Sequence, residues 1–324
     1  MKRREWMVAV AAALLEAASP APAQISDNVV RIGLLTDMSG VLSDPDGRGG
    51  VEAIKMAIAD FGGAVLGQPI ELLTVDHQNK PDIGAQKARE WDDQSGLTMI
   101  LGGSNTGVSL AINAVVKEKK VPFFAIGAAG ASLTGKDCTP YTIHYAYDTT
   151  ALGNGTAKTI LDQGGKSWFF LTADYAFGTQ LQNAAGDVVK AGGGTVVGAV
   201  RVPLGTSDFA SYLLQAQSSG AQVLGLANAG NDFSNSLKAA TEFGITKTMK
   251  PAALLVFLTD IKAIGLENAQ GLYLTAAWYW DLNDKSREFG KRFLAKVGRE
   301  PREGGTVSLG YEASQVHHGG CTHL

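Results

Sequence analysis

Cysteine is scarce in this chain, whose 324 residues include only Cys138 and Cys321. An oxidising compartment would permit a disulfide between these two residues, but their spacing does not require one, so the sequence leaves open whether they pair. Blocks of lysine and arginine are also lacking in the body of the chain, and the net charge is only −3. This charge balance argues against nucleic acid as a partner.

Long apolar runs are lacking as well. Beyond the N-terminus no run reaches the roughly eighteen residues that a membrane-spanning helix needs. With 45% hydrophobic and 18% charged residues, the composition is that of a soluble globular protein. The chain does begin with an export signal, because basic residues at 2–4 precede the mostly apolar stretch 6–18 and an A-x-A cleavage site at 21–23. We therefore expect a signal peptide at 1–23, and no membrane anchor because no cysteine follows the cleavage site.

Strand-like and helix-like segments alternate along the rest of the chain. Strand patterns occupy residues 29–36, 69–76, 98–101 and 121–126, and helical spacing follows each of the first three, with Asp82 as the expected cap of the second helix. The alternation restarts with strands at 167–172, 195–200, 222–227, 253–257 and 271–276. Repeated units of this kind predict an α/β fold with doubly wound parallel sheets.

A chain of this length is long for a single core, so we expect two lobes. The segment 141–147 alternates aromatic and small residues and leads out of the first set of strands, and the chain returns near 274–280. We therefore predict two doubly wound lobes joined by a hinge. Lobe 1 comprises 28–147 plus 277–311, lobe 2 comprises 148–276, and an aberrant or disordered tail occupies 312–324.

Residues 100–107 (ILGGSNTG) combine a strand end, a tight turn and a helix start. Backbone N–H groups, the positive end of the helix dipole and the hydroxyls of Ser104 and Thr106 would together suit an anion such as a carboxylate. In open α/β sheets, ligands bind beyond the carboxyl ends of the strands, where such turns lie. The alternative is an ordinary capped helix, with Ser104 or Asn105 as its N-cap.

No catalytic motif is complete in this sequence. Residues 102–106 nearly match the nucleophile elbow G-x-S-x-G, but Thr106 stands at the last position. Residues 127–132 lack the spacing of a dinucleotide-binding turn, and no phosphate-loop lysine is present. The His and Cys residues at 317–323 have the side chains of metal ligands but lie at the chain end, without a predicted supporting structure. We predict no catalytic residue, no metal and no cofactor.

Several of these segments recur in one order. They are residues 32–40 (IGLLTDMSG), 102–106, 127–130 with 133–135, and 174–178 (DYAFG). Together with the export signal, they resemble the periplasmic solute-binding proteins of ABC importers, of type I fold and of the leucine/isoleucine/valine-binding kind. The resemblance runs from about residue 28 to about 303. It implies two lobes that close on a small solute and then dock on an inner-membrane permease.

The resemblance also implies a set of ligand-binding positions. Ser104, Asn105 and Thr106 match the turn that holds the ligand carboxylate, and Gly127, Ala128 and Ala129 match a second backbone-and-hydroxyl contact. Lobe 2 would add aromatic and polar positions after its strands. The full expected set is Ser39, Ser104, Asn105, Thr106, Gly127, Ala128, Ala129, Tyr175, Phe177, Asn228, Asp232 and Phe257.

The sequence departs from the family pattern in three places. Ala129 lacks the hydroxyl that is common in branched-chain amino-acid binders, and Phe257 stands where they commonly carry an acid for the ligand ammonium. Asp232 or Asp260 could substitute for that acid. Residues 312–324 do not resemble the family's continuation, so we interpret the C-terminal part as truncated or frameshifted.

The functional prediction is the extracytoplasmic solute-binding component of an ABC importer, located in the periplasm. Its solute would be a hydrophobic or branched-chain amino acid or an aromatic carboxylate. An exported hydrolase of unrecognised type and a ligand-sensing input domain are the alternatives.

Overall fold

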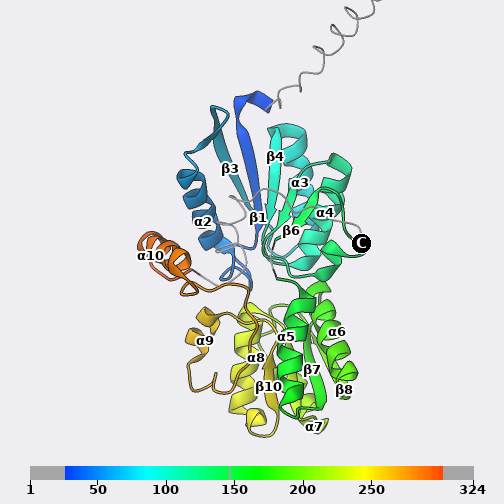
Figure 1. Cartoon of the computed structure of the whole chain (residues 1–324). Helices are drawn as coiled ribbons and strands as arrows, with labels where there is room; N and C mark the ends of the chain where they lie inside the picture. Colours follow the sequence, from blue (N-terminus) through cyan, green and yellow to red (C-terminus); the bar gives the residue numbers. More distant parts are fainter. Residues whose placement is uncertain (1–25, 146, 302–324) are drawn as a thin grey trace, which may run out of the picture.

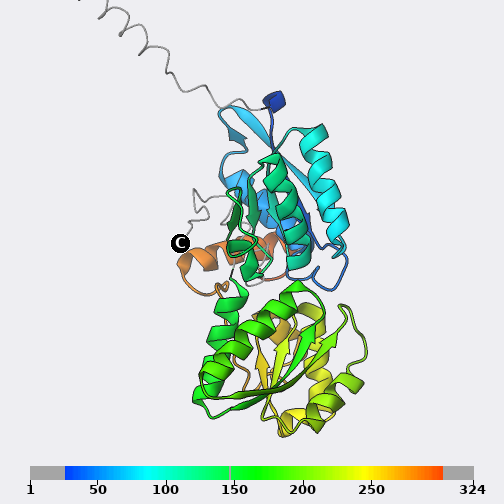
Figure 2. The same cartoon turned by 90° about the vertical axis from the view of Figure 1, so that its right-hand side faces the viewer.

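The computed structural model describes residues 26–145 and 147–301, in which the strands form two sheets flanked by helices (Figures 1 and 2). One sheet has six strands in the order β2-β3-β1-β4-β5-β6, and the other has four in the order β10-β9-β7-β8. Among the described strand pairs, β2 and β3 are antiparallel and the others are parallel. The predicted α/β class with two doubly wound parallel lobes is confirmed.

The six-stranded lobe is built mainly from the N-terminal part of the described chain. Its elements are η1 (Ser26–Asn28), β1 (Val30–Thr36), α2 (Gly47–Asp60), β2 (Ala64–Val65), β3 (Gln68–Asp76), α3 (Pro81–Ser95), β4 (Leu97–Gly102), α4 (Thr106–Lys119), β5 (Phe123–Ala125), η2 (Ala131–Thr134) and β6 (Thr142–His144).

The four-stranded lobe follows in the sequence. Its elements are α5 (Thr149–Asp162), β7 (Ser167–Ala173), α6 (Ala176–Ala191), β8 (Thr195–Val202), α7 (Ala210–Ser218), β9 (Val223–Ala227), α8 (Gly230–Glu242), η3 (Ile245–Lys247), β10 (Lys250–Ala253) and α9 (Leu258–Ile264). The last described helix is α10 (Asp284–Val297).

Both faces of each sheet are covered by helices. Successive side chains of a strand point to opposite faces, and in β1 both Leu34 and Leu35 are fully buried. Leu35 belongs to an apolar cluster with α3 and α4, whereas Leu34 belongs to a cluster that includes Ile54 of α2. In the second lobe, α5 and α6 cover one face and α7 and α8 the other. Apolar strands of this kind are typical of a parallel sheet buried on both sides.

The chain passes between the lobes twice in its described part. It leaves the six-stranded sheet after β6, and after α9 it runs back to α10, which lies beside α2 (Figure 1). Phe289 and Phe293 of α10 pack with Ala53 and Met56 of α2, and the Arg292 guanidinium lies 2.6 Å from the Asp60 carboxylate. These contacts place α10 against the six-stranded lobe, while the exact domain boundaries stay a prediction.

Three local predictions were wrong. The strand expected at 271–276 is absent from the described chain, because Leu272 and Leu274 pack on the apolar cluster of the second lobe without pairing to β10. The strand expected at 253–257 is β10 in the structure, and it ends at Ala253. Residues 254–257 therefore lie beyond the carboxyl end of this strand. Lys80 rather than Asp82 is the N-cap of α3, because Pro81 already occupies the first helical position.

Cys138 is disulfide-bonded, which answers a question that the sequence left open. Spacing along a chain does not report distance in the fold, so the positions of the two cysteines in the sequence could not decide whether they pair. Cys321, the chain's other cysteine, and the possible metal ligands at 317–323 lie outside the described residues.

Within 26–145 and 147–301, no group of three His, Cys, Asp or Glu residues could hold a metal, and no helix has the length and apolarity to cross a membrane.

The packing of α10 on α2 can be tested by truncating one buried ring. Phe293 is fully buried, so Phe293→Ala should lower the free energy of unfolding by about 3–5 kcal/mol, measured by urea denaturation. The neighbouring Leu294 is 44% exposed, and Leu294→Ala should stay within about 0.5 kcal/mol of the wild type. Equal losses for the two variants would show that α10 is not docked as described.

Candidate functional site

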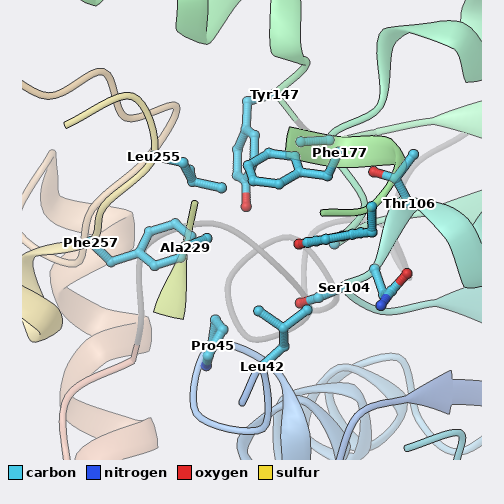
Figure 3. A pocket seen from close by; sticks show the side chains of 13 residues that line it. Leu42, Pro45, Ser104, Thr106, Tyr147, Phe177, Ala229, Leu255 and Phe257 are labelled. Atoms are coloured by element: carbon cyan, nitrogen blue, oxygen red, sulfur yellow. The ribbon is translucent and has the colours of Figure 1, made fainter. Parts of the chain in front are cut away.

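A cavity lies where the carboxyl ends of the strands of one sheet face those of the other (Figure 3). Its lining comes from the loops after β1, β4, β5 and β6 in the first lobe, and after β7, β9 and β10 in the second. The lining residues are Leu42, Pro45, Ser104, Asn105, Thr106, Gly127, Ala129, Tyr147, Tyr175, Phe177, Ala229, Leu255 and Phe257. None of these residues is charged.

The structure brings most of the sequence-predicted positions to this cavity. Those in the lining are Ser104, Asn105, Thr106, Gly127, Ala129, Tyr175, Phe177 and Phe257. Those outside it are Ser39, Ala128, Asn228 and Asp232. Lining residues that the sequence reasoning missed are Leu42, Pro45, Tyr147, Ala229 and Leu255. The missed residues also follow strand ends, which is the signal that could have identified them.

The start of α4 supplies the polar part of the lining. Asn105 is the N-cap, with φ at 85° and its side-chain oxygen accepting a hydrogen bond from Val108 N at 3.1 Å. The Thr106 side chain is fully buried, and its hydroxyl has no hydrogen-bond partner among the described residues. In Figure 3 this hydroxyl lies at the right of the view, and that of Ser104 lies lower and nearer the centre. A buried hydroxyl without a partner is costly unless a ligand or water completes it.

Asp46 holds the turn between β4 and α4 through a hydrogen bond. It is fully buried, and its carboxylate accepts a hydrogen bond from the Ser104 N–H. A Cβ atom at Gly103 would lie 2.8 Å from an Asp46 carboxylate oxygen and 2.2 Å from the Thr36 hydroxyl, so only glycine allows this approach. The sequence suggested that the N–H groups of this turn were free to bind a ligand. In the structure the Ser104 N–H already donates a hydrogen bond to Asp46.

A second buried carboxylate connects the remaining parts of the first-lobe wall. Asp37 accepts hydrogen bonds from Leu42 N at 2.9 Å and from the Asn79 side chain at 2.6 Å. Asn79 in turn accepts one from the Asn105 side chain at 3.1 Å. His77 is buried beside this network, and burial lowers its pKa. The network fixes Leu42 and Asn105, which both line the cavity.

Aromatic rings form most of the opposite wall. The rings of Tyr147 and Phe257 lie 6.2 Å apart, and those of Tyr175 and Phe177 lie 5.7 Å apart, within the range of favourable aromatic contacts. Burial raises the pKa of both tyrosine hydroxyls. Both phenols therefore remain protonated at neutral pH and can donate hydrogen bonds. Figure 3 shows the Tyr147 hydroxyl directed into the cavity.

The predicted residues outside the lining have structural partners instead. The Ser39 hydroxyl donates to Asp76 at 2.6 Å, and the Ala128 carbonyl accepts from the His144 ring at 2.7 Å. The Asn228 amide donates to the Ser236 hydroxyl at 3.0 Å.

Asp232 has a structural partner too, and a shifted pKa. Its carboxylate accepts from Gly205 N at 3.0 Å. Burial raises the pKa of Asp232 to about 6, although the hydrogen bond from Gly205 lowers it.

The comparisons with known proteins agree with this two-lobed architecture. A family model described as periplasmic binding protein matches residues 29–316. The chain belongs to the periplasmic binding protein family. Its fold and family are those of substrate-binding proteins, so the resemblance read from the sequence is confirmed.

Individual relatives point to the ABC transporter type within this family. A Leu/Ile/Val-binding protein homolog 6 of Brucella abortus is 27% identical over 303 residues, covering 89% of this chain and 75% of the relative. A periplasmic binding protein from Burkholderia mallei has a similar structure, with a TM-score of 0.87, 56% identity, and coverage of 89% of this chain and 76% of that one. A branched-chain amino acid ABC transporter periplasmic ligand-binding protein from Burkholderia xenovorans is 41% identical, with a TM-score of 0.74 and coverage of 88% and 76%.

The pKa of Asp232 predicts a pH-dependent stability. The native carboxyl holds its proton to a higher pH than the unfolded value of 3.8, so the free energy of unfolding should fall as the pH rises from about 4 to about 6. Asp232→Asn removes the ionisation but keeps an oxygen for the Gly205 N–H. We expect the variant to be more stable than the wild type by about 1 kcal/mol at pH 7.5 and equal to it near pH 4, measured by urea denaturation.

The control for this prediction is Asp208→Asn, at an exposed position in the same lobe. It should leave the difference between the two pH values as in the wild type. A stability gain for Asp232→Asn of the same size at both pH values would contradict the assignment of the titration to this carboxyl.

Proposed function

We propose that the protein is the periplasmic solute-binding component of an ABC importer. It captures a small solute that carries one carboxylate and an apolar or aromatic body, and delivers it to an inner-membrane permease. The observation that carries the proposal is the buried, unpartnered Thr106 hydroxyl at the start of α4, in a cavity shared by both lobes. Membership of the periplasmic binding protein family supports capture between lobes and release to a permease.

The start of α4 provides the donors for the carboxylate. The backbone N–H groups of the first helical turn have no partner within the helix, and the helix dipole favours a negative group there. The hydroxyls of Ser104 and Thr106 add two donors to the lining (Figure 3). Because the Ser104 N–H is occupied by Asp46, we place the carboxylate against the two hydroxyls and the Thr106 N–H. Such charge-assisted bonds contribute about 1.5–3 kcal/mol each.

The remainder of the cavity suits an aromatic body better than an α-amino group. Four aromatic rings line it, and no carboxylate is found among its described lining residues. The two acids that could pair with a ligand ammonium, Asp232 and Asp260, lie outside this lining, and each accepts a backbone N–H, from Gly205 at 3.0 Å and from Phe257 at 3.1 Å. An ammonium group would be desolvated here without a carboxylate partner, which is unfavourable. Aromatic carboxylates are therefore the preferred solute class, ahead of leucine-like amino acids.

The double variant Ser104→Ala with Thr106→Val tests the carboxylate site. It keeps the backbone and nearly the same volume but removes both hydroxyl donors. We expect the dissociation constant for the bound carboxylate to rise tenfold or more, measured by calorimetry against a panel of aromatic acids and amino acids.

The matched control is Thr195→Val with Ser211→Ala, which makes the same chemical changes at exposed positions of the second lobe. The control should bind like the wild type. An unchanged affinity in the cavity variant would remove the start of α4 from the site, and turnover of a carboxylate or amide by the wild type would contradict the proposed role as a carrier.

A further inference from the structure

One pair of side chains joins the two lobes directly beside the cavity. The Ser132 N–H donates to the Gln180 side-chain oxygen at 3.0 Å, and the Gln180 side-chain nitrogen donates to the Ser132 hydroxyl at 3.1 Å. Ser132 lies in η2 of the six-stranded lobe, and Gln180 lies in α6 of the four-stranded lobe. The two residues thus make a reciprocal hydrogen-bonded pair between the lobes.

Neither residue of this pair lines the cavity, and only Gln180 belongs to an element that does. Gln180 lies one helical turn after Phe177, and Ser132 follows the turn that contains Ala129. Both side chains are partly buried. The pair can therefore respond to how closely the lobes approach without touching a bound solute.

A weaker contact joins the lobes through a different loop. The Asn231 N–H at the start of α8 lies 3.5 Å from the Val41 carbonyl, next to Gly230, where a Cβ atom would come within 2.7 Å of the same oxygen. Val41 precedes the cavity residue Leu42. This contact is made by two backbone groups, and it needs a glycine at position 230, so no side-chain substitution removes it alone. Both hydrogen bonds of the Ser132–Gln180 pair use the Gln180 side chain, so one substitution at Gln180 removes them.

We propose that Gln180 is a positioning residue that holds the lobes closed over the solute, acting through Ser132. The inference rests on the proposed function in that the solute binds between the lobes. Apparent affinity depends on the fraction of molecules in the binding-competent closed state. Loss of the two hydrogen bonds that link the lobes in this structure lowers this fraction and speeds release of the solute.

Three variants separate this role from a general effect on α6. Gln180→Ala removes both hydrogen bonds. Gln180→Glu retains two acceptor oxygens, one for the Ser132 N–H and one for the Ser132 hydroxyl, which can rotate to donate. Gln182→Ala is the matched control, because Gln182 lies in the same helix but accepts from the Thr172 hydroxyl at 2.7 Å within its own lobe.

Spin labels on introduced cysteines measure lobe closure independently of affinity. Gln94→Cys in α3 and Asn183→Cys in α6 place the labels at exposed positions, one on each lobe. Distance distributions with and without benzoate then give the closed fraction for each variant. Stopped-flow displacement of benzoate gives the dissociation rate.

We expect Gln180→Ala to lower the closed fraction and to raise the benzoate dissociation rate about five- to tenfold. Gln180→Glu and Gln182→Ala should match the wild type in both measurements. Equal closed fractions in Gln180→Ala and the wild type would overturn the inference, whether or not benzoate binds. If no carboxylate binds the wild type, the proposed function fails, and the closed fractions without ligand still decide the role of Gln180.

Discussion

The parallel pairing of the strands is the constraint on which this site depends. In a parallel sheet all strands end at one edge, so the loops that follow them converge. Every lining residue of the cavity follows the carboxyl end of a strand, from Leu42 after β1 to Phe257 after β10. Because the two sheets present these edges to each other, segments far apart in the sequence form one cavity. The helices that cover both faces of each sheet hold its strands in place.

Within that framework, two buried carboxylates give the first-lobe wall its shape. Asp46 holds the turn before α4 through the Ser104 N–H, and Asp37 holds Leu42 and Asn79. Buried charges of this kind need hydrogen-bond partners, and here the partners are backbone and amide groups of the loops themselves. The consequence is a preformed polar end facing a wall of aromatic rings. A solute with a carboxylate at one end and a flat apolar body matches both ends.

The sequence was informative about periodic features and less so about the loops. The alternating strand and helix patterns predicted both sheets, and residues 100–107 correctly predicted a helix start, with Asn105 as one of two expected N-caps. Long-range contacts explain what was missed. Nothing local to Asp46 indicates that it binds the Ser104 N–H, and nothing in residues 271–276 shows that Leu272 packs on the second lobe without joining its sheet. Tyr147 was seen as part of a connecting segment, but its position over the cavity depends on how the lobes meet.

The proposed site recognises the charge of a carboxylate, attached to an aromatic body, at the start of α4. Calorimetry of the mature protein with benzoate, its neutral analogue benzamide and leucine measures this most directly. We expect benzoate to bind at least about tenfold more tightly than either of the other two. Benzamide binding as tightly as benzoate, or leucine binding more tightly, would contradict it.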